Sequence, residues 1–136
     1  MSLIPPVLAL IGWTFVMWVW LYATRIPALR AARVDLEAVS RTGAKLDLPP
    51  AVARVADNYN HLHEQPTLFY ALALAAQLSV AVDGISVALA WTYVGLRVIH
   101  SFVQATRNVI IVRFYVFATA SLILLLLLLR TAWLLV

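Results

Sequence analysis

The sequence predicts an all-α integral membrane protein, built as one domain of four membrane-spanning helices. Hydrophobic residues make up 64% of the 136 residues, whereas soluble domains contain about 45–50%. Charged residues make up only 12%, against about 25% in soluble domains. The apolar residues also form runs as long as the roughly 20 residues that cross the hydrocarbon core of a bilayer. These observations exclude a soluble or disordered chain, and the absence of cysteine excludes disulfides, thiolate metal sites and a cysteine nucleophile.

The first spanning helix is expected over residues 3–33. Residues 3–24 carry no charge, and Arg25 marks the end of this apolar part. Pro5 and Pro6 fall in the first turn, where a missing N–H group costs no hydrogen bond. The alternative is a cleaved signal peptide, which we favour less because no positively charged segment precedes the apolar run.

The second helix is expected over residues 51–82, after a polar interfacial segment. That segment mixes basic and acidic side chains, namely Arg25, Arg30, Arg33, Arg41, Lys45, Asp35, Glu37 and Asp47. The helix has a polar first half and an apolar second half, so we expect it to enter the membrane polar end first. Pro66 lies between the two halves and is expected to kink the helix, because a proline frees the carbonyl four residues before it.

The third and fourth helices are expected over residues 84–106 and 108–135. Asp83-Gly84 is a turn signal, and Asp83 is a typical N-cap, so helices two and three are expected to form a tight hairpin. The fourth helix carries Arg113 about one turn inside its start.

The distribution of basic residues predicts the orientation of the chain. Nine of the ten Lys and Arg residues, all except Arg130, lie on one side of the four helices. The positive-inside rule places that side in the cytoplasm and both termini in the periplasm. We expect a bacterial inner membrane, because the chain carries no organelle-retention or lipidation signal. The net charge of +4 therefore reflects topology and does not indicate a nucleic-acid partner.

Two groups of polar side chains lie near the cytoplasmic ends of the helices. The first group falls on one face of the third helix by its 3-4-3 spacing and consists of Arg97, His100, Gln104 and Arg107. The second group shares a face of the second helix and consists of Asn60, His63 and Glu64. Such groups are costly within the hydrocarbon, so they face a bundle interior or a ligand. The alternatives are arginines whose charged ends reach the interface, and hydrogen bonds that join helices.

Arg113 is the deepest charge on the cytoplasmic side, and it needs an anionic partner. Glu64 and the carboxylate of a bound ligand are the two candidates. No metal site is expected, because His61 and His63 are two residues apart and point about 200° from each other on a helix. A channel or transporter is a weaker alternative, because the polar groups gather at one face of the membrane instead of tracing a path across it.

The order of these features resembles a known family. Asn60 stands six residues before Pro66, which is followed by Leu68-Phe69-Tyr70, and Arg97-Val98-Ile99-His100-Ser101 precedes Arg113. Over most of its length the chain resembles the membrane-associated proteins in eicosanoid and glutathione metabolism (MAPEG). That superfamily includes microsomal glutathione transferases and microsomal prostaglandin E synthase.

The resemblance implies a homotrimer of four-helix subunits. Glutathione would bind as a cosubstrate at the cytoplasmic side, between helices 1 and 2 of one subunit and helices 3 and 4 of the next. Arg113 would be the catalytic residue, since a guanidinium beside the sulfur favours the reactive thiolate. The glutathione-binding residues implied by the resemblance are Arg25 or Arg30, Asn60, His63, Glu64, Arg97, His100 and Gln104. The implied activity is that of a transferase or peroxidase acting on small lipophilic electrophiles or hydroperoxides that arrive through the bilayer.

Three positions depart from the pattern of the family. His63 stands where the family usually has glutamate, with Glu64 one position later. Gln104 replaces a common tyrosine, and Phe114 follows Arg113 in place of a residue with a hydroxyl group. Gln104 and Phe114 favour the alternative function, which is a non-catalytic lipid-binding or partner-presenting protein on the same scaffold.

Overall fold

The computed structural model describes residues 1–43 and 47–136, so the predicted interfacial residue Lys45 lies outside the described residues. The described ranges fold into helices without a strand. In chain order, the helices are α1 (Ile4–Ala31), α2 (Leu36–Thr42), α3 (Pro50–His61), α4 (Gln65–Leu78), α5 (Gly84–Ala105) and α6 (Ile110–Leu135).

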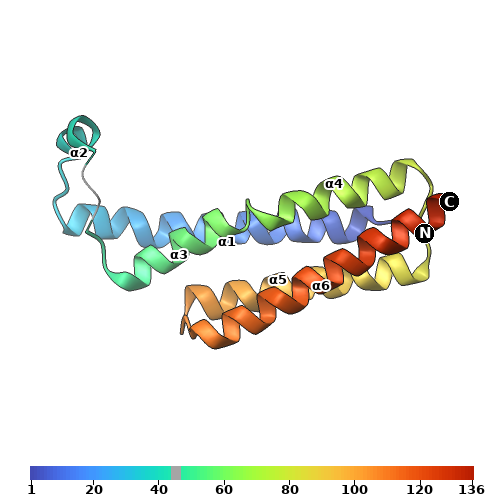
Figure 1. The fold of residues 1–136 in the computed structure, drawn as a ribbon. Coiled ribbons are helices and arrows are strands. Elements are labelled where there is room, and N and C mark those ends of the chain that lie inside the picture. Colours follow the sequence, from blue (N-terminus) through green and yellow to red (C-terminus); the bar gives the residue numbers. More distant parts are fainter. Residues whose placement is uncertain (44–46) are drawn as a thin grey trace.

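The long helices lie nearly parallel along one axis (Figure 1). α1 runs away from the N-terminus, and α3 and α4 return beside it. α5 and α6 form a second hairpin and pack against each other, with α5 also in contact with α1 and α3. Both chain ends lie at one end of the molecule, and α2 lies at the other. The far part of α1 projects beyond the turn between α5 and α6, which separates α2 from the rest of the bundle.

Among the residues that the structure describes, three helices are long and apolar enough to cross a membrane, namely α1, α5 and α6. α1 has 28 residues and is therefore about 42 Å long, more than the roughly 30 Å of a hydrocarbon core. Its start follows the expected pattern, with two prolines in the first turn. α4 has 14 residues and spans only about 21 Å, so it does not cross a bilayer without a contribution from α3.

The single helix expected over residues 51–82 is corrected to two helices with an interruption between them. Residues 62–64 leave the helical hydrogen-bond pattern, and Pro66 stands in the first turn of α4. A proline has no N–H group and collides with the carbonyl of the residue four positions earlier, here Leu62. The second helix of the pair also ends at Leu78, earlier than expected, and a turn leads from there to Asp83.

The short helix α2 was not predicted. Asp35 caps its start by accepting hydrogen bonds from the backbone N–H groups of Glu37 and Ala38, both at 3.0 Å. Gly43 closes its end with a positive φ of 65°, a conformation that favours glycine. These two residues are ordinary start and stop signals, but they enclose only seven residues within a polar segment.

The core has two parts along the bundle axis. The larger part joins α1, α4, α5 and α6, and several of its members are small, including Ala73, Ala76, Ala90 and Ala120. Small residues allow helices to approach closely within a membrane. The smaller part lies nearer α2 and joins α1, α3 and α5 through Met17, Val55, Leu62 and Ala105.

The end of the bundle near the chain termini is held by a polar contact. Asp83 caps α5 by accepting hydrogen bonds from the backbone N–H and hydroxyl groups of Ser86, both at 2.8 Å. The same carboxylate forms an ion pair with Arg130 of α6, whose Nε lies 3.1 Å from Oδ2. The expected N-cap is therefore present, and Arg130 has its acidic partner at this end.

Candidate functional site

The side chain of Arg97 is buried inside the helix bundle. It is 1% exposed, and all three of its guanidinium nitrogens lack a hydrogen-bond partner. The guanidinium carbon lies 5.7 Å from the ring centre of Tyr93 and 5.4 Å from that of Phe117. Cation–π contacts of this kind offset part of the cost of burial, by about 2 kcal/mol or more for a desolvated pair. No acidic side chain in residues 1–43 and 47–136 forms an ion pair with it.

Other buried polar groups continue the same face of α5. Ser101 and Gln104 follow Arg97 at helical spacing, and the Ser101 hydroxyl and the Gln104 Oε1 have no hydrogen-bond partner. On α3, Asn58 is 1% exposed, and both polar atoms of its side chain also lack a partner. Buried polar groups in proteins are almost always hydrogen-bonded, so four such residues in one region indicate a place for a polar ligand or ordered water.

A cavity of about 380 Å³ opens between the end of α3 and the facing sides of α5 and α6. We call it the α3–α6 cavity, and its lining residues are His61, His100, Ile110, Arg113, Phe114 and Phe117. The rings of His61 and His100 lie 5.1 Å apart. Phe117 connects the cavity to Arg97, because it contacts both histidines and the guanidinium.

Arg113 contributes a guanidinium to the lining of the α3–α6 cavity. Its Nη1 donates a hydrogen bond of 2.6 Å to Oδ1 of Asn108, while its Nε has no partner. Asn108 adopts a positive φ of 53° in the turn between α5 and α6, a conformation that asparagine tolerates better than most residues. Glu64, one of the two anions considered for Arg113, instead contacts His61 at 2.7 Å between Oε2 and Nδ1.

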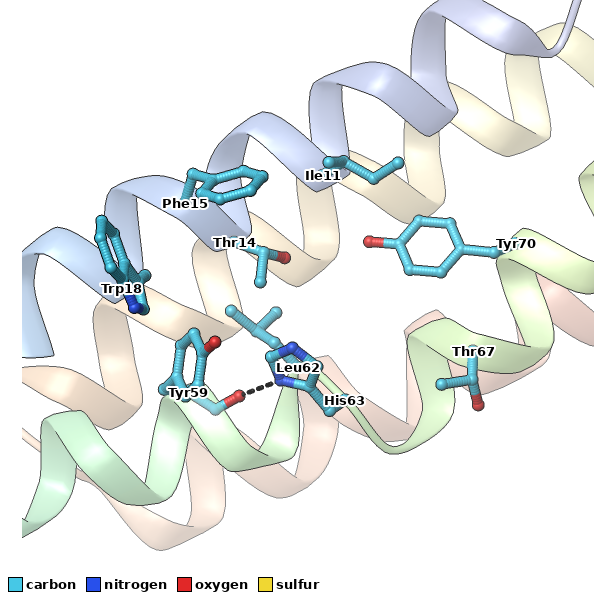
Figure 2. Close-up of a pocket in the computed structure, with 9 residues that line it drawn as sticks. All are labelled: Ile11, Thr14, Phe15, Trp18, Tyr59, Leu62, His63, Thr67 and Tyr70. Carbon is cyan, nitrogen blue, oxygen red and sulfur yellow. Dashed lines mark hydrogen bonds between the residues drawn. The ribbon is translucent and has the colours of Figure 1, made fainter.

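A second, smaller cavity lies on the opposite side of α3, between α1 and the α3–α4 pair (Figure 2). We call it the α1–α4 groove, with a volume of about 210 Å³. It is lined mainly by apolar and aromatic side chains, namely Ile11, Thr14, Phe15, Trp18, Tyr59, Leu62, His63, Thr67 and Tyr70. Figure 2 shows the hydroxyl of Tyr70 pointing into the gap beside α1.

His63 enters the groove because the helix is interrupted. Its backbone N–H bonds to the carbonyl of Asn60, not to that of Tyr59, as a continuous helix would require. The Tyr59 carbonyl is thus free to accept from the ring Nδ1 of His63 at 2.8 Å. His61 and His63 therefore line different cavities, as their spacing of two residues predicts, and the interruption adds the hydrogen bond that holds His63.

The structure brings together some of the residues predicted for the site and separates others. His100 and Arg113 line the α3–α6 cavity, and Arg97 reaches its wall through Phe117. Gln104 is buried on the same helix face as Arg97, whereas His63 belongs to the groove on the other side. Six predicted residues line neither cavity: the buried Arg97 and Gln104, Glu64, which contacts His61, the half-buried Arg25, and the exposed Arg30 and Asn60.

Comparison with known proteins decides the family. The family model described as the MAPEG family matches residues 3–133, which is nearly the whole chain. The chain belongs to the MAPEG family. Neither the curated proteins nor the solved structures contain a match. MAPEG membership agrees with the apolar helices and makes this an integral membrane protein of a family related to glutathione, with both enzymes and non-catalytic members.

Asn58 is the residue that sequence reasoning missed in this MAPEG chain. The spacing to Pro66 directed attention to Asn60, which the structure leaves exposed. The face of the helix could have identified Asn58, because Val55 and Leu62 stand three residues before it and four residues after it and are both buried in the core. An asparagine on the apolar face of a helix is less common than one on the polar face. It is therefore the stronger indication of a functional residue.

Proposed function

We propose that the protein is a glutathione-dependent membrane transferase or peroxidase that acts on lipophilic electrophiles or hydroperoxides. One observation carries this proposal: two arginines without an acidic partner lie beside the same cavity, in a chain of the MAPEG family. Intramembrane arginines are usually paired with an anion, and the described acidic side chains do not supply one here. The anion is therefore expected from the ligand.

Glutathione has the charges that this region requires. It carries two carboxylates, one ammonium group and a thiol, so it calls for arginines, hydrogen-bonding amides and an acid near one another. In the proposed complex, Arg97 and His100 form the polar floor. Gln104 and either Asn58 or Asn60 hold the peptide groups of glutathione. Glu64 contributes the acidic side chain. Arg113 stabilises the thiolate, which is the nucleophile.

The complete site is proposed to form between subunits of a homotrimer. Within one subunit the α1–α4 groove and the α3–α6 cavity lie on different faces. In a ring built by a heterologous interface, one face of a subunit meets a different face of its neighbour. Such a ring would join the groove of one subunit, with His63, to the cavity of the next, with Arg113.

The membrane arrangement belongs to the same proposal. α3 and α4 together would supply a fourth crossing beside α1, α5 and α6, completing a four-helix bundle. The polar site would face the cytoplasm of a bacterial cell, and both termini would face the periplasm. A lipophilic substrate would then reach the sulfur laterally from the inner leaflet.

The ultraviolet absorbance of bound thiolate tests the proposed activity. The purified protein is expected to show this signal when glutathione is added at neutral pH, because Arg113 stabilises the anion. Arg113→Ala is expected to lose the signal, whereas Arg41→Ala, on the distant helix α2, is expected to retain it. Binding of glutathione without any thiolate in the parent protein would contradict the catalytic assignment.

A second function is favoured by the apolar character of the α3–α6 cavity. Ile110, Phe114 and Phe117 make up half of its lining, and no hydroxyl follows Arg113. A non-catalytic protein that binds a lipid or presents it to a partner would use such a lining. Calorimetric titration separates the two functions, since fatty-acid binding without glutathione binding selects the second.

A further inference from the structure

The pair formed by His61 and Glu64 has the geometry of an acid–base dyad. Nδ1 of His61 lies 2.7 Å from Oε2 of Glu64. An ionised carboxylate only accepts hydrogen bonds, so the imidazole is the donor at Nδ1 and its other nitrogen, Nε2, keeps a free lone pair. A histidine that is oriented by a carboxylate in this way is the usual form of a general base.

The ring of His61 belongs to the same cavity as Arg113. It lines the α3–α6 cavity, lies 5.4 Å from Phe117 between ring centres, and has a side chain that is 22% exposed. The base is thus reachable from the cavity and is held there by ring contacts on one side and by Glu64 on the other. An exposed hydrogen bond of this kind contributes little to stability, so its main physical effect is to fix the tautomer and direction of the imidazole.

The other two histidines do not share this arrangement. His63 donates to a backbone carbonyl and lies in the α1–α4 groove. His100 lines the α3–α6 cavity but is 3% exposed and has no carboxylate partner among the described residues. Only His61 combines a carboxylate, access to the cavity and proximity to the proposed sulfur position.

We propose that His61 is the general base that removes the proton from the bound thiol, and that Glu64 positions it. This inference rests on the proposed glutathione-dependent function and assigns a residue that the family resemblance did not indicate. It also assigns Glu64 a role different from the one expected, because its carboxylate acts through His61 and not directly on the ligand.

The proton balance is simple for addition to a conjugated carbonyl compound. The thiol proton passes to Nε2 of His61, and the electron pair of the S–H bond stays on sulfur beside Arg113. The thiolate forms the new C–S bond at the β-carbon, and the double bond shifts to give an enolate. His61 then returns the proton to the α-carbon, so that no further reactant is required. The carboxylate of Glu64 offsets the charge of the imidazolium in the presence of the Arg113 cation.

Chemical rescue tests the role of His61 in the full-length protein in proteoliposomes, with glutathione and an unsaturated aldehyde as substrates. His61→Ala is expected to lower kcat/KM by about 100-fold, within the usual range for a general base. Added imidazole is expected to restore at least about a tenth of the parent value, because it fits the space left by the side chain. Arg113→Ala should gain nothing from imidazole. Rescue of His100→Ala in place of His61→Ala would overturn the proposal.

Glu64→Gln tests the positioning role without removing the base. Glutamine keeps an oxygen that accepts from Nδ1 but loses the charge, so kcat is expected to fall by about tenfold while KM for glutathione changes by less than about twofold. Glu37→Gln on α2 is the matched control and should behave as the parent protein. A rise in KM with unchanged kcat would mean that Glu64 binds the ligand directly.

The outcomes distinguish this inference from the function on which it rests. A parent protein that neither binds glutathione nor forms the thioether overturns both. A parent protein that is active, with His61→Ala and His61→Gln equally active and correctly folded by circular dichroism, overturns the dyad alone. Should His61→Ala fail to fold, the kcat and KM of Glu64→Gln still decide whether Glu64 acts through the base.

Discussion

A buried guanidinium without an anion makes Arg97 costly to the ligand-free protein. By insertion scales, an arginine near the middle of a span costs about 2.5–3.5 kcal/mol, and the two aromatic contacts lower this cost without supplying a counter-charge. The burial of Arg97 lowers the stability of the ligand-free protein, and this indicates that the residue serves to bind an anion. The same residue should therefore affect stability and ligand binding in opposite directions.

Arg97→Met tests this exchange. The substitution is expected to raise the free energy of unfolding of the ligand-free protein by about 1 kcal/mol, because a flexible apolar chain of similar length replaces an unpaired charge. It is also expected to abolish the increase in thermal midpoint that glutathione gives the parent protein. Thermal unfolding in detergent, with and without glutathione, measures both effects.

The matched control is Arg107→Met, since Arg107 is exposed in the turn between α5 and α6. Its thermal midpoint should stay close to that of the parent protein, and the increase produced by glutathione should persist. A lower midpoint for Arg97→Met in the absence of ligand would show that the aromatic contacts, and not a missing anion, explain the burial of this arginine.

The interruption between α3 and α4 is the element that shapes the site. In a continuous helix, His61 and His63 would differ by about 200° but would keep the regular hydrogen-bond pattern. The interruption releases the Tyr59 carbonyl, which then holds His63, and it leaves His61 at the last position of α3 beside Glu64. Pro66 therefore helps to position the two histidines as well as to separate α3 from α4.

The sequence predicted the helical elements better than it predicted their interruptions. The apolar runs and the Asp83-Gly84 signal located α1, α5 and α6 to within a few residues at each end. The effect of Pro66 was underestimated, because a proline inside a helix produces either a kink or a break and neighbouring contacts decide between them. Charge and spacing predicted Arg97, His100 and Arg113 as site residues, which stays a prediction, but the contact of Glu64 with His61 depends on the interrupted backbone.

The end of the bundle opposite α2 gives an element-scale prediction. Hydrogen bonds from Arg130 and then from Ser86 hold the pKa of the Asp83 carboxyl well below its usual range. Because the pKa in the folded state is lower than the value of about 3.9 in an unfolded chain, Asp83 contributes fully to stability above that value. The contribution is lost as the pH falls toward the folded pKa. The contact between the start of α5 and the C-terminal part of α6 should therefore become weaker at low pH.

Asp83→Asn separates the charge from the cap, because asparagine is also a good N-cap residue. Its thermal midpoint is expected to be lower than that of the parent protein at pH 7 and to approach it as the pH is lowered below about 4. Asp35→Asn is the control, since Asp35 caps α2 without an arginine partner among the described contacts. A constant difference between Asp83→Asn and the parent at every pH would show that the ion pair with Arg130 contributes nothing.

At the scale of the whole molecule, the two separate cavities allow a test of whether the proposed site is shared between neighbouring subunits. His63→Ala alters the groove and Arg113→Ala alters the cavity, so each variant alone is expected to lose most of its activity. In mixed trimers formed from equal amounts, an interface is intact only when an unaltered groove meets an unaltered cavity, which occurs in about a quarter of cases for a heterologous ring. Co-expression should therefore restore about 25% of the parent activity.

A site contained within one subunit gives a different result, because no combination of the two altered chains then restores a complete site. Mixing the two variants after separate purification, without subunit exchange, is the control and should restore nothing. Recovery in the co-expressed sample alone would support both the ring and the division of the site between neighbours.

Both chain ends lie at the same end of the bundle, away from α2. A short flexible peptide could therefore connect the last residue of one copy to the first residue of another without reversing either copy. Three copies joined in this manner would form a single polypeptide in which each interface carries its own chosen substitution. The fold thus permits a gene encoding a covalently linked form of the proposed trimer, in which the contribution of each proposed site to turnover can be counted separately.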